Sequence, residues 1–315
     1  MKEIKSKKNY SYLLLNLVVW SIYVLLSLSI FSFNIISLVN NDNYSSKNFF
    51  LVILSIFAIF IGIVFFKQFT KNIFIIEIDL EKIKLGKNET YYLSDIVDIK
   101  LTGKFYFDFI VSYNREGTAI TFKDGTVKYF FDDFYENTWK MKQFLEQVVI
   151  QKKDSVIINS IENKKVKIND DEIDTFKGYT LLCFEGFMFW VFEFFFIAIM
   201  ISALNRKDYF PTIFSVCFIT FWFIIFSNLL NYFYLTNEYL IVKNHNYFWK
   251  KDIYLLKNIK EVIIESHGRQ SLGLTIITND FKSKKNVAAS LYNSTWLELK
   301  NKLEQQGVKV RSVVL

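Results

Sequence analysis

Two glutamates, Glu185 and Glu193, interrupt an apolar stretch that runs from Gly178 to Asn205. The two lie eight positions apart, so on a helix their side chains would fall about 80° apart, broadly on one side. An acidic residue at the centre of a membrane helix costs about 3 kcal/mol on insertion scales. Such residues usually face the interior of a helix bundle and mark a functional site or a polar contact between helices.

Two interpretations of these glutamates follow. In the first, a protonated Glu193 forms a hydrogen bond across a helix bundle, and Glu185 reaches the lipid headgroups. In the second, the pair belongs to a proton or ion pathway. The other apolar stretches offer no central Lys or Arg as a partner, and this favours the first interpretation. The candidate partners are Asn16, Asn34, Thr220, Asn228 and Asn231.

Other catalytic chemistry has little support in the sequence. The two histidines, His245 and His267, have no second metal-type ligand at a useful spacing, and Cys183 and Cys217 form no Cys-x-x-Cys motif. Phosphate-loop, nucleophile-elbow and zinc-protease motifs are missing from the sequence. We therefore expect no catalytic residue, no metal, no cofactor and no enzyme. A lipid-modifying enzyme would lack a nucleophile–base pair.

Four long apolar stretches predict the fold class. The chain carries a net charge of +7, yet 52% of its residues are hydrophobic and 19% are aromatic. A helix of about 20 residues crosses the hydrocarbon layer. We therefore predict four transmembrane helices, as one hairpin within residues 1–70 and another within 178–235. A removable signal peptide is the rival interpretation of the first stretch, but that stretch is much longer than a signal h-region. The four stretches are Asn9–Asn41, Asn48–Phe66, Gly178–Asn205 and Tyr209–Asn237.

The lysines beside the predicted helices indicate their orientation. Lys2, Lys5, Lys7 and Lys8 precede the first helix, whereas the first turn offers only Lys47. Because positive residues favour the cytoplasmic side, we predict a multi-pass protein of the bacterial inner membrane with both termini in the cytoplasm.

The polar regions read as two β domains, residues 71–150 and 236–315, joined by a segment 151–177 that could be a tether or an added strand. Strand-like alternation fills both regions, and Asp124–Gly125 predicts a two-residue hairpin turn. Each region ends in helical spacing. Asn137 and Thr138 are candidate caps of the first closing helix, and Thr295 with Glu298 fits a capping box at the second.

These regions repeat one another. Tyr135, Thr138 and Trp139 recur 157 positions later as Tyr292, Thr295 and Trp296. Earlier in each copy, Leu93 aligns with Leu256 and Glu81 with Glu238, with six extra residues near "NYFWKKD" in the second copy. The pattern indicates a tandem duplication. We expect the two tryptophans to fill the cores beneath the closing helices, rather than to stack on a ligand.

The order of an apolar helix pair, "YLTNEYLIVKN", "IYLLKNIKEVIIES" and a Trp-bearing helix resembles bacterial pleckstrin-homology-like membrane proteins of the YcxB and YdbS/YdbT kind. The resemblance covers nearly the whole chain. It implies, for each copy, a seven-stranded, partly open barrel plugged by a C-terminal helix. It does not imply a defined activity.

Basic residues on the first hairpins could meet a membrane surface, because each Lys near anionic lipid adds about 1 kcal/mol of attraction. Specific binding of a phosphoinositide-like headgroup is a narrower alternative, and nucleic acid is disfavoured because acidic residues are interspersed. The residues are Lys82, Lys84 and Lys87 in the first copy and Lys243, Lys250 and Lys251 in the second.

The sequence thus predicts a non-enzymatic, membrane-anchored scaffold or regulator with two pleckstrin-homology-like domains. Its partners would be the bilayer and an unidentified cytoplasmic or membrane protein. A role in immunity to a toxin, a role in envelope stress and a homo-oligomer all stay open. The competing hypothesis is a small transporter or channel that uses Glu193 and Glu185.

Overall fold

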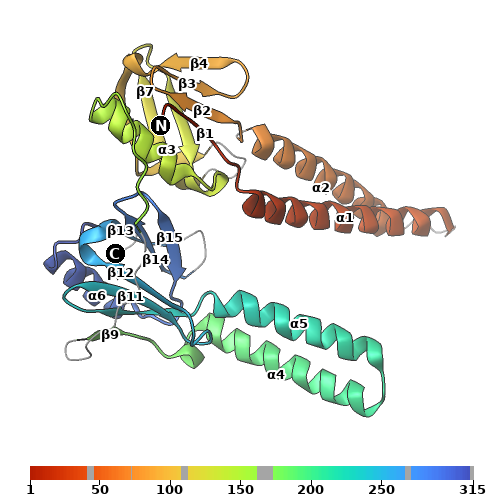
Figure 1. Ribbon diagram of the computed structural model, residues 1–315. Coiled ribbons are helices and arrows are strands. Elements are labelled where there is room, and N and C mark those ends of the chain that lie inside the picture. Colours follow the sequence, from red (N-terminus) through yellow and green to blue (C-terminus); the bar gives the residue numbers. More distant parts are fainter. Residues whose placement is uncertain (41–45, 72, 108–112, 162–172, 267–270, 313–315) are drawn as a thin grey trace. The chain divides into compact units, whose positions relative to one another are not determined.

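The chain divides into two compact units, Met1–Ile158 and Asn159–Leu315, and each is described here by itself. The structure is a computed structural model that describes residues 1–40, 46–71, 73–107, 113–161, 173–266 and 271–312. In each unit a pair of long helices projects from a β-rich part (Figure 1). Each helix pair therefore belongs to the same unit as the strands that follow it in sequence.

The first unit contains two antiparallel sheets. One has the strand order β1-β2-β3-β4; the other has the order β5-β7-β6, with β8 paired to β7. Its helices are α1 (Tyr10–Asn40), α2 (Ser46–Lys71) and α3 (Thr138–Leu145). Its strands are β1 (Glu3–Lys5), β2 (Ile76–Asp79), β3 (Lys82–Leu85), β4 (Glu89–Tyr92), β5 (Ile96–Lys100), β6 (Lys104–Phe107), β7 (Tyr113–Phe122) and β8 (Val127–Phe131).

The second unit has the same plan. Its sheets have the orders β12-β11-β10-β9 and β15-β14-β13-β16, and β16 pairs with β13 in parallel. Its helices are α4 (Phe184–Asn205), α5 (Tyr209–Ser227) and α6 (Asn293–Gln305). Its strands are β9 (Asp174–Phe176), β10 (Asn231–Leu235), β11 (Tyr239–Asn244), β12 (Lys251–Leu255), β13 (Ile259–Glu265), β14 (Gly273–Thr278), β15 (Ser283–Val287) and β16 (Val310–Ser312).

The order of elements recurs from unit to unit: a short strand, a helix pair, three strands, a 3₁₀ turn, further strands and a closing helix. Individual bonds recur with it. The backbone N–H of Leu93 donates to the carbonyl of Glu81 at 2.7 Å, and that of Leu256 donates to Glu238 at 2.8 Å. These are the residue pairs that the sequence aligned, and the shared geometry is what a tandem duplication produces. Strand β9 lies inside the segment 151–177, so the end of that segment is an added strand.

Alternation along the strands places apolar side chains in the two cores. In β2, Ile76 and Ile78 are fully buried, and the residues after each are partly exposed. In β10 the same alternation buries Phe233 and Leu235. A strand sends successive side chains to opposite faces, so the period-two pattern read in the sequence is the pattern of a half-buried sheet.

Two local predictions are wrong, and a third holds only for the position of the residue. The β7–β8 turn has three residues, Lys123, Asp124 and Gly125, because Phe122 N–H donates to the Thr126 carbonyl at 2.9 Å. Gly125 takes the left-handed conformation, with φ of +80°, that such three-residue turns require. Asn137 occupies the N-cap position of α3, as predicted, but its side chain makes no capping bond. Thr295 is not a cap, because α6 begins two residues before it.

The prediction of four transmembrane helices is also wrong. Among the described residues, only α4 is long and apolar enough to cross a membrane. The apolar stretches of the other long helices have between 10 and 17 residues. Since 17 helical residues rise about 26 Å, they fall short of a hydrocarbon layer of about 30 Å. An integral membrane fold with two transmembrane hairpins is therefore replaced by a sheet-rich fold with four sheets and one candidate spanning helix.

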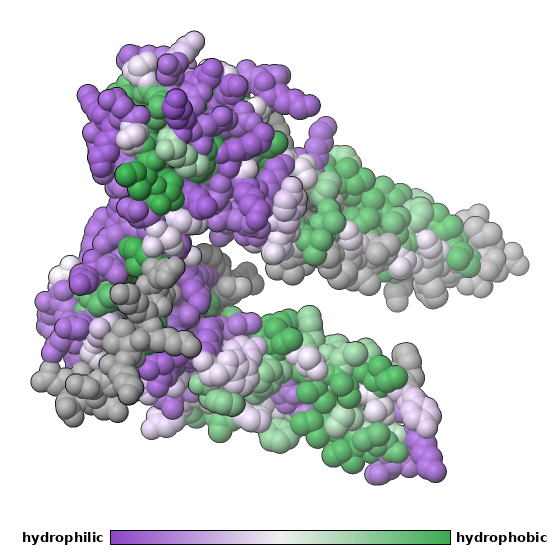
Figure 2. Space-filling model, in the orientation of Figure 1, coloured by the Kyte–Doolittle hydropathy of each residue, from purple (hydrophilic) through white to green (hydrophobic). Residues whose placement is uncertain are grey.

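For the first stretch, the prediction rested on the absence of charged residues. Helix α1 also contains serines and asparagines that bond to its own backbone: Ser27 Oγ donates to the Tyr23 carbonyl at 2.9 Å and Asn34 Nδ2 to that of Ile30 at 2.7 Å. A multi-pass location in the inner membrane with both termini in the cytoplasm depended on all four helices, so it is contradicted by the same finding. Figure 2 shows hydrophobic residues along the projecting helices and hydrophilic residues over much of the β-rich parts.

Candidate functional site

Glu185 lies in the first turn of α4, next to the β-rich part of the second unit. Its Oε1 accepts a hydrogen bond from Ser271 Oγ, which precedes β14. An acidic group in the first helical turn also interacts favourably with the helix dipole. Glu185 therefore ties the start of α4 to the β part, and its predicted reach toward headgroups stays a prediction.

Glu193 lies two turns further along α4 and is buried, with 6% of its surface exposed. Its Oε1 has no hydrogen-bond partner among the described residues. The stacked rings of Phe192 and Trp222, 4.7 Å apart, join α4 to α5 just beside it. Glu193 thus faces the α4–α5 contact, as the packing interpretation expects, but an amide or hydroxyl partner is not found there.

The amides proposed as partners of Glu193 bond elsewhere. Asn34 and Asn228 each donate to the backbone carbonyl four residues earlier, that of Ile30 and of Ile224 respectively. Asn16 lies in α1, and its side chain is outside the described set. Thr220 also bonds one turn back, to the Val216 carbonyl. Within the described part of the second unit, Glu185 and Glu193 are therefore not joined to Thr220 or Asn228 by hydrogen bonds.

Asn231 instead organises a buried polar cluster where α5 enters the sheet. Its Nδ2 donates to the carbonyls of Val287, at 2.7 Å, and Asn228, at 3.0 Å. Its Oδ1 accepts from Asn244 Nδ2 at 3.0 Å and from Lys250 Nζ at 3.2 Å. The sequence placed Asn231 inside a membrane and Lys250 at its surface, and the structure brings the two into direct contact.

Lys250 lies in the β11–β12 loop, and further hydrogen bonds hold this loop against the end of α5. Asn244 Nδ2 donates to the Ser227 carbonyl at 2.6 Å, and Asn246 Nδ2 donates to Ser227 Oγ at 2.8 Å. Burial and the neighbouring Lys177 lower the pKa of His245, the first residue of the loop, to about 4. Burial likewise lowers the pKa of Lys250. The end of α5, the start of β10 and the β11–β12 loop therefore form one hydrogen-bonded junction.

The predicted basic residues lie at corresponding hairpins of the two units. Lys82 and Lys84 belong to β3, and Lys87 is exposed in the turn that follows it. Lys243 lies near the end of β11 with its Nζ 4.6 Å from the centre of the Tyr234 ring, and Lys251 is exposed at the start of β12. Lysines remain accessible at both hairpins, as surface binding requires.

The three residues shared by both copies have different surroundings. Trp296 is 1% exposed and packs against Phe233 in the core of the second unit, whereas Trp139 is only partly buried. Tyr135 is buried and donates to the Phe74 carbonyl at 2.7 Å, but Tyr292 is 48% exposed. The expected tryptophan plug is therefore present in the second unit alone.

The remaining two shared residues are the threonines. Thr138 is buried, and its Oγ1 donates to the Tyr135 carbonyl at 2.9 Å. Thr295 is only partly buried. The first copy thus buries its Tyr and Thr where the second buries its Trp.

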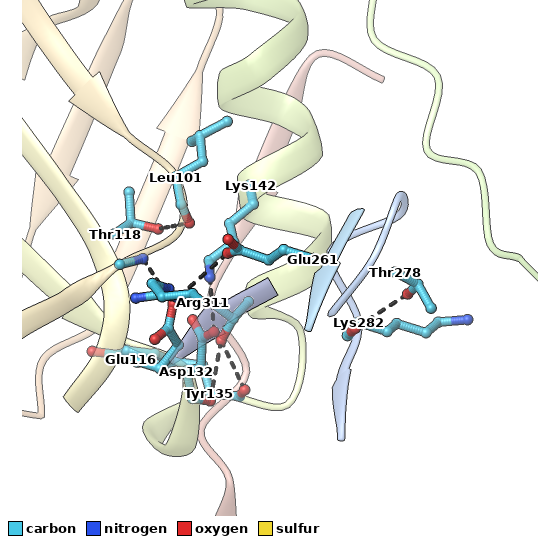
Figure 3. A network of polar contacts seen from close by, with 12 residues as sticks. Leu101, Glu116, Thr118, Asp132, Tyr135, Lys142, Glu261, Thr278, Lys282 and Arg311 are labelled. Carbon is cyan, nitrogen blue, oxygen red and sulfur yellow. Dashed lines mark hydrogen bonds and ion pairs between the residues drawn. The ribbon is translucent and has the colours of Figure 1, made fainter. Parts of the chain in front are cut away.

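Sequence reasoning missed a buried ion pair in the first unit. Lys142 on α3 is 1% exposed, and its Nζ lies 2.7 Å from Asp132 Oδ2 (Figure 3). The aligned positions in the second copy hold Leu299 and Ala289. The sequence signal for this ion pair was the alignment of Lys142 with Leu299, which places a lysine at an apolar position of the closing helix.

Two exposed aromatic residues were also missed. Phe248 is 85% exposed and Trp249 is 66% exposed, both in the β11–β12 loop. They lie within the extra residues of the second copy, near "NYFWKKD". These extra residues were interpreted only as a difference in loop length, although large aromatic residues inserted into a loop can indicate a binding function.

The described residues contain no group of three or more His, Cys, Asp or Glu that could hold a metal ion. No family model matches the chain, and no curated protein matches it. The resemblance to pleckstrin-homology-like membrane proteins therefore stays a prediction.

Proposed function

We propose that this chain is a non-enzymatic binding protein that attaches to a membrane through α4 and presents its two β-rich parts to a protein partner. The observation that carries the proposal is the exposed apolar surface of α4. The most apolar 18 residues of this 22-residue helix have a mean hydropathy of 2.2, and only 17% of them are buried. A contiguous exposed apolar surface of this kind marks a site of contact with lipid or protein.

The exposed residues of α4 are large. Phe184, Phe194 and Phe195 are 73%, 64% and 57% exposed, and Leu204 near the other end is 55% exposed. At 1.5 Å per residue the helix rises about 33 Å, comparable with a hydrocarbon layer of about 30 Å. Burial of this surface in lipid, at about 25 cal/mol per Å² of apolar area, is a strong driving force for attachment.

The duplicated β-rich parts support the second half of the proposal. The two units share an order of elements but differ in what they bury and expose at Tyr135/Tyr292 and Trp139/Trp296. Two related surfaces on one chain raise the effective concentration of the second contact once the first has formed. We propose that both surfaces engage the same protein partner or assembly.

Vesicle flotation of the full chain tests attachment. We expect the double variant Phe194→Asp/Phe195→Asp to float at least tenfold less than the wild type, because each buried acid costs about 3 kcal/mol. Val97→Asp is the control, since Val97 is 67% exposed on β5 of the first unit. Equal flotation of the double variant and the wild type would contradict attachment through α4.

Cross-linking of the full chain in its native membranes tests whether the β-rich parts contact a protein partner. Lysine-reactive reagents should join a protein partner to exposed lysines of the β-rich parts, such as Lys87 and Lys251. Since α4 and α5 contain no lysine, a photo-reactive reagent that couples to any residue is used beside them. If that reagent joins the partner only to α4 or α5, recognition resides in the helices and the proposal for the β-rich parts is wrong.

A further inference from the structure

We infer that the second unit contacts an anionic lipid surface through an aromatic rim at the base of α4. The rim consists of Tyr179, Leu181 and Leu182, which lead into α4, and Phe248 and Trp249 in the β11–β12 loop. The inference rests on the proposed attachment through α4, and it adds the class of lipid and the residues that contact it.

The β11–β12 loop is held against the end of the helix pair that adjoins the sheet. His245 N–H donates to the Leu230 carbonyl at 3.0 Å, and Asn246 Nδ2 donates to Ser227 Oγ at 2.8 Å. The Tyr247 ring packs 5.6 Å from that of Phe223 on α5. Phe223 in turn lies 6.0 Å from Phe189, in the second turn of α4. The loop and the start of α4 therefore lie at the same end of the helix pair.

The exposed aromatic side chains stand on an ordered turn. The backbone N–H groups of Asn246 and Tyr247 both donate to Asn244 Oδ1, at 2.9 Å each. Asn244 is itself buried and bonded to Asn231. Phe248 and Trp249 follow this turn directly and turn 85% and 66% of their surfaces outward. The hydrogen bonds to Asn244 fix the turn, and in this conformation the Phe248 and Trp249 rings are exposed to solvent.

The segment that leads into α4 shows the same exposure. Tyr179 is 72% exposed, and Leu181 and Leu182 are 62% and 71% exposed. Tyr and Trp are favoured at the boundary between lipid and water, where an apolar ring meets polar headgroups. A rim of such residues at the end of an apolar helix is the arrangement expected where a chain leaves a bilayer.

Lysines lie beside the rim, and an acid close to it in sequence, Glu185 in the first turn of α4, is hydrogen-bonded to Ser271. Lys177 and Lys243 lie 5.2 Å and 4.6 Å from the centres of the Tyr232 and Tyr234 rings, and Lys251 is exposed at the start of β12. The acid nearest to them in sequence, Asp252, is paired with Lys284 at 2.7 Å. Lysines beside interfacial aromatic residues favour anionic headgroups, at about 1 kcal/mol per lysine.

The first unit lacks this loop. Its corresponding turn is Gly86–Lys87–Asn88, and Gly86 N–H donates to the Ile75 carbonyl at 2.8 Å just as His245 does to Leu230. The same anchoring bond therefore supports a short polar turn in one copy and an aromatic loop in the other. The aromatic residues are an addition that the fold does not require.

Tryptophan quenching by brominated lipids tests the inference in the full chain reconstituted into vesicles. The contribution of Trp249 is the difference between the wild type and Trp249→Phe. With bromine near the headgroup end of the acyl chains, we expect this contribution to be quenched at least twofold. Trp296→Phe is the control, because Trp296 is buried in the protein core and its contribution should not be quenched.

Trp190 on α4 separates this inference from the proposed function. It is 39% exposed, so Trp190→Phe reports whether α4 meets lipid. If Trp190 is quenched and Trp249 is not, the rim inference is overturned while attachment through α4 stands. If neither is quenched, both are overturned.

The lipid class is tested by comparing phosphatidylcholine vesicles with vesicles that also contain phosphatidylglycerol. Quenching of Trp249 should increase with the anionic fraction in the wild type, and Lys243→Gln/Lys251→Gln should remove most of that increase. Quenching that is equal in both vesicle types would show an interfacial rim without charge selectivity and would overturn the anionic assignment.

Discussion

Asn231 and Lys250 form a direct hydrogen bond, from Nζ to Oδ1 at 3.2 Å, at the junction of α5 with the sheet. The same Oδ1 also accepts from Asn244, and the Asn231 Nδ2 donates to two backbone carbonyls. One side-chain amide therefore fixes the end of α5, the start of β10 and the β11–β12 loop. Buried polar groups that are fully bonded in this way specify one arrangement.

Replacement of Asn231 by Ala should destabilise the second unit. The variant removes one hydrogen-bond partner from the Val287 carbonyl, from Asn244 Nδ2 and from Lys250 Nζ. A buried group left unsatisfied costs about 1–3 kcal/mol. Urea unfolding followed by tryptophan fluorescence measures the loss. Asn88→Ala, in the exposed turn of the first unit, is the control and should change little. An Asn231→Ala midpoint equal to that of the wild type would contradict this role.

The Lys142–Asp132 pair in the first unit should depend on both partners. Lys142→Leu leaves Asp132 without its cation and should cost about 3 kcal/mol or more. The double variant Asp132→Ala/Lys142→Leu reproduces Ala289 and Leu299 of the second copy. It should recover most of the loss, because a packed apolar pair often matches a buried ion pair in stability. Equal losses in the single and double variants, by urea unfolding, would contradict the interpretation.

The stability of the second unit should fall as the pH falls from about 6.5 toward 4. Burial and Lys177 hold the pKa of His245 at about 4 in the folded protein, below the ordinary value of 6.5. Between these values the unfolded chain binds the proton more readily, so acid favours unfolding. Ser290 Oγ, at 3.4 Å, and the Tyr232 ring are its other neighbours. Urea midpoints measured across this range should fall less steeply in His245→Gln; identical slopes would exclude His245 as the cause.

The two repeat-related tryptophans should differ in their contribution to stability. Trp296→Ala empties a fully buried site and should cost about 3–5 kcal/mol. Trp139→Ala removes a partly buried side chain and should cost less than half as much. Thermal or urea unfolding of the two variants makes the comparison within one chain. A larger loss for Trp139 would mean that the first unit also depends on its tryptophan as a plug.

The sequence predicted the strands and the duplication well because both depend on local pattern. Period-two alternation fixes which side of a strand is buried, and the aligned pairs Glu81–Leu93 and Glu238–Leu256 make the same backbone bond. The capping bond expected of Asn137 is not formed because Asn137 uses its side chain elsewhere. Its Oδ1 accepts from Lys7 N–H, and its Nδ2 donates to the Lys5 carbonyl. That contact spans 130 residues and leaves no local trace in the sequence.

The candidate site was predicted less well. Glu193 lies on a buried helix face, but two of its expected amide partners, Asn34 and Asn228, bond to the backbones of their own helices. Asn231 and Lys250 were both selected, for separate roles, and only the folded chain shows that they meet. Phe248 and Trp249 were overlooked because exposure of an aromatic residue depends on loop geometry and not on composition.

Both ends of each helix pair continue into neighbouring strands of a single sheet. In the first unit Ile4 pairs with Ile78 across β1 and β2, and in the second Thr175 pairs with Tyr234 across β9 and β10. Because both ends of the helix pair join paired strands, a change in the orientation of the helices would also move those two strands. A force that tilts α4 and α5 would consequently shift β9 and β10, and with them the paired strand β11 and the β11–β12 loop. The position of this loop would then depend on the tilt of the helices.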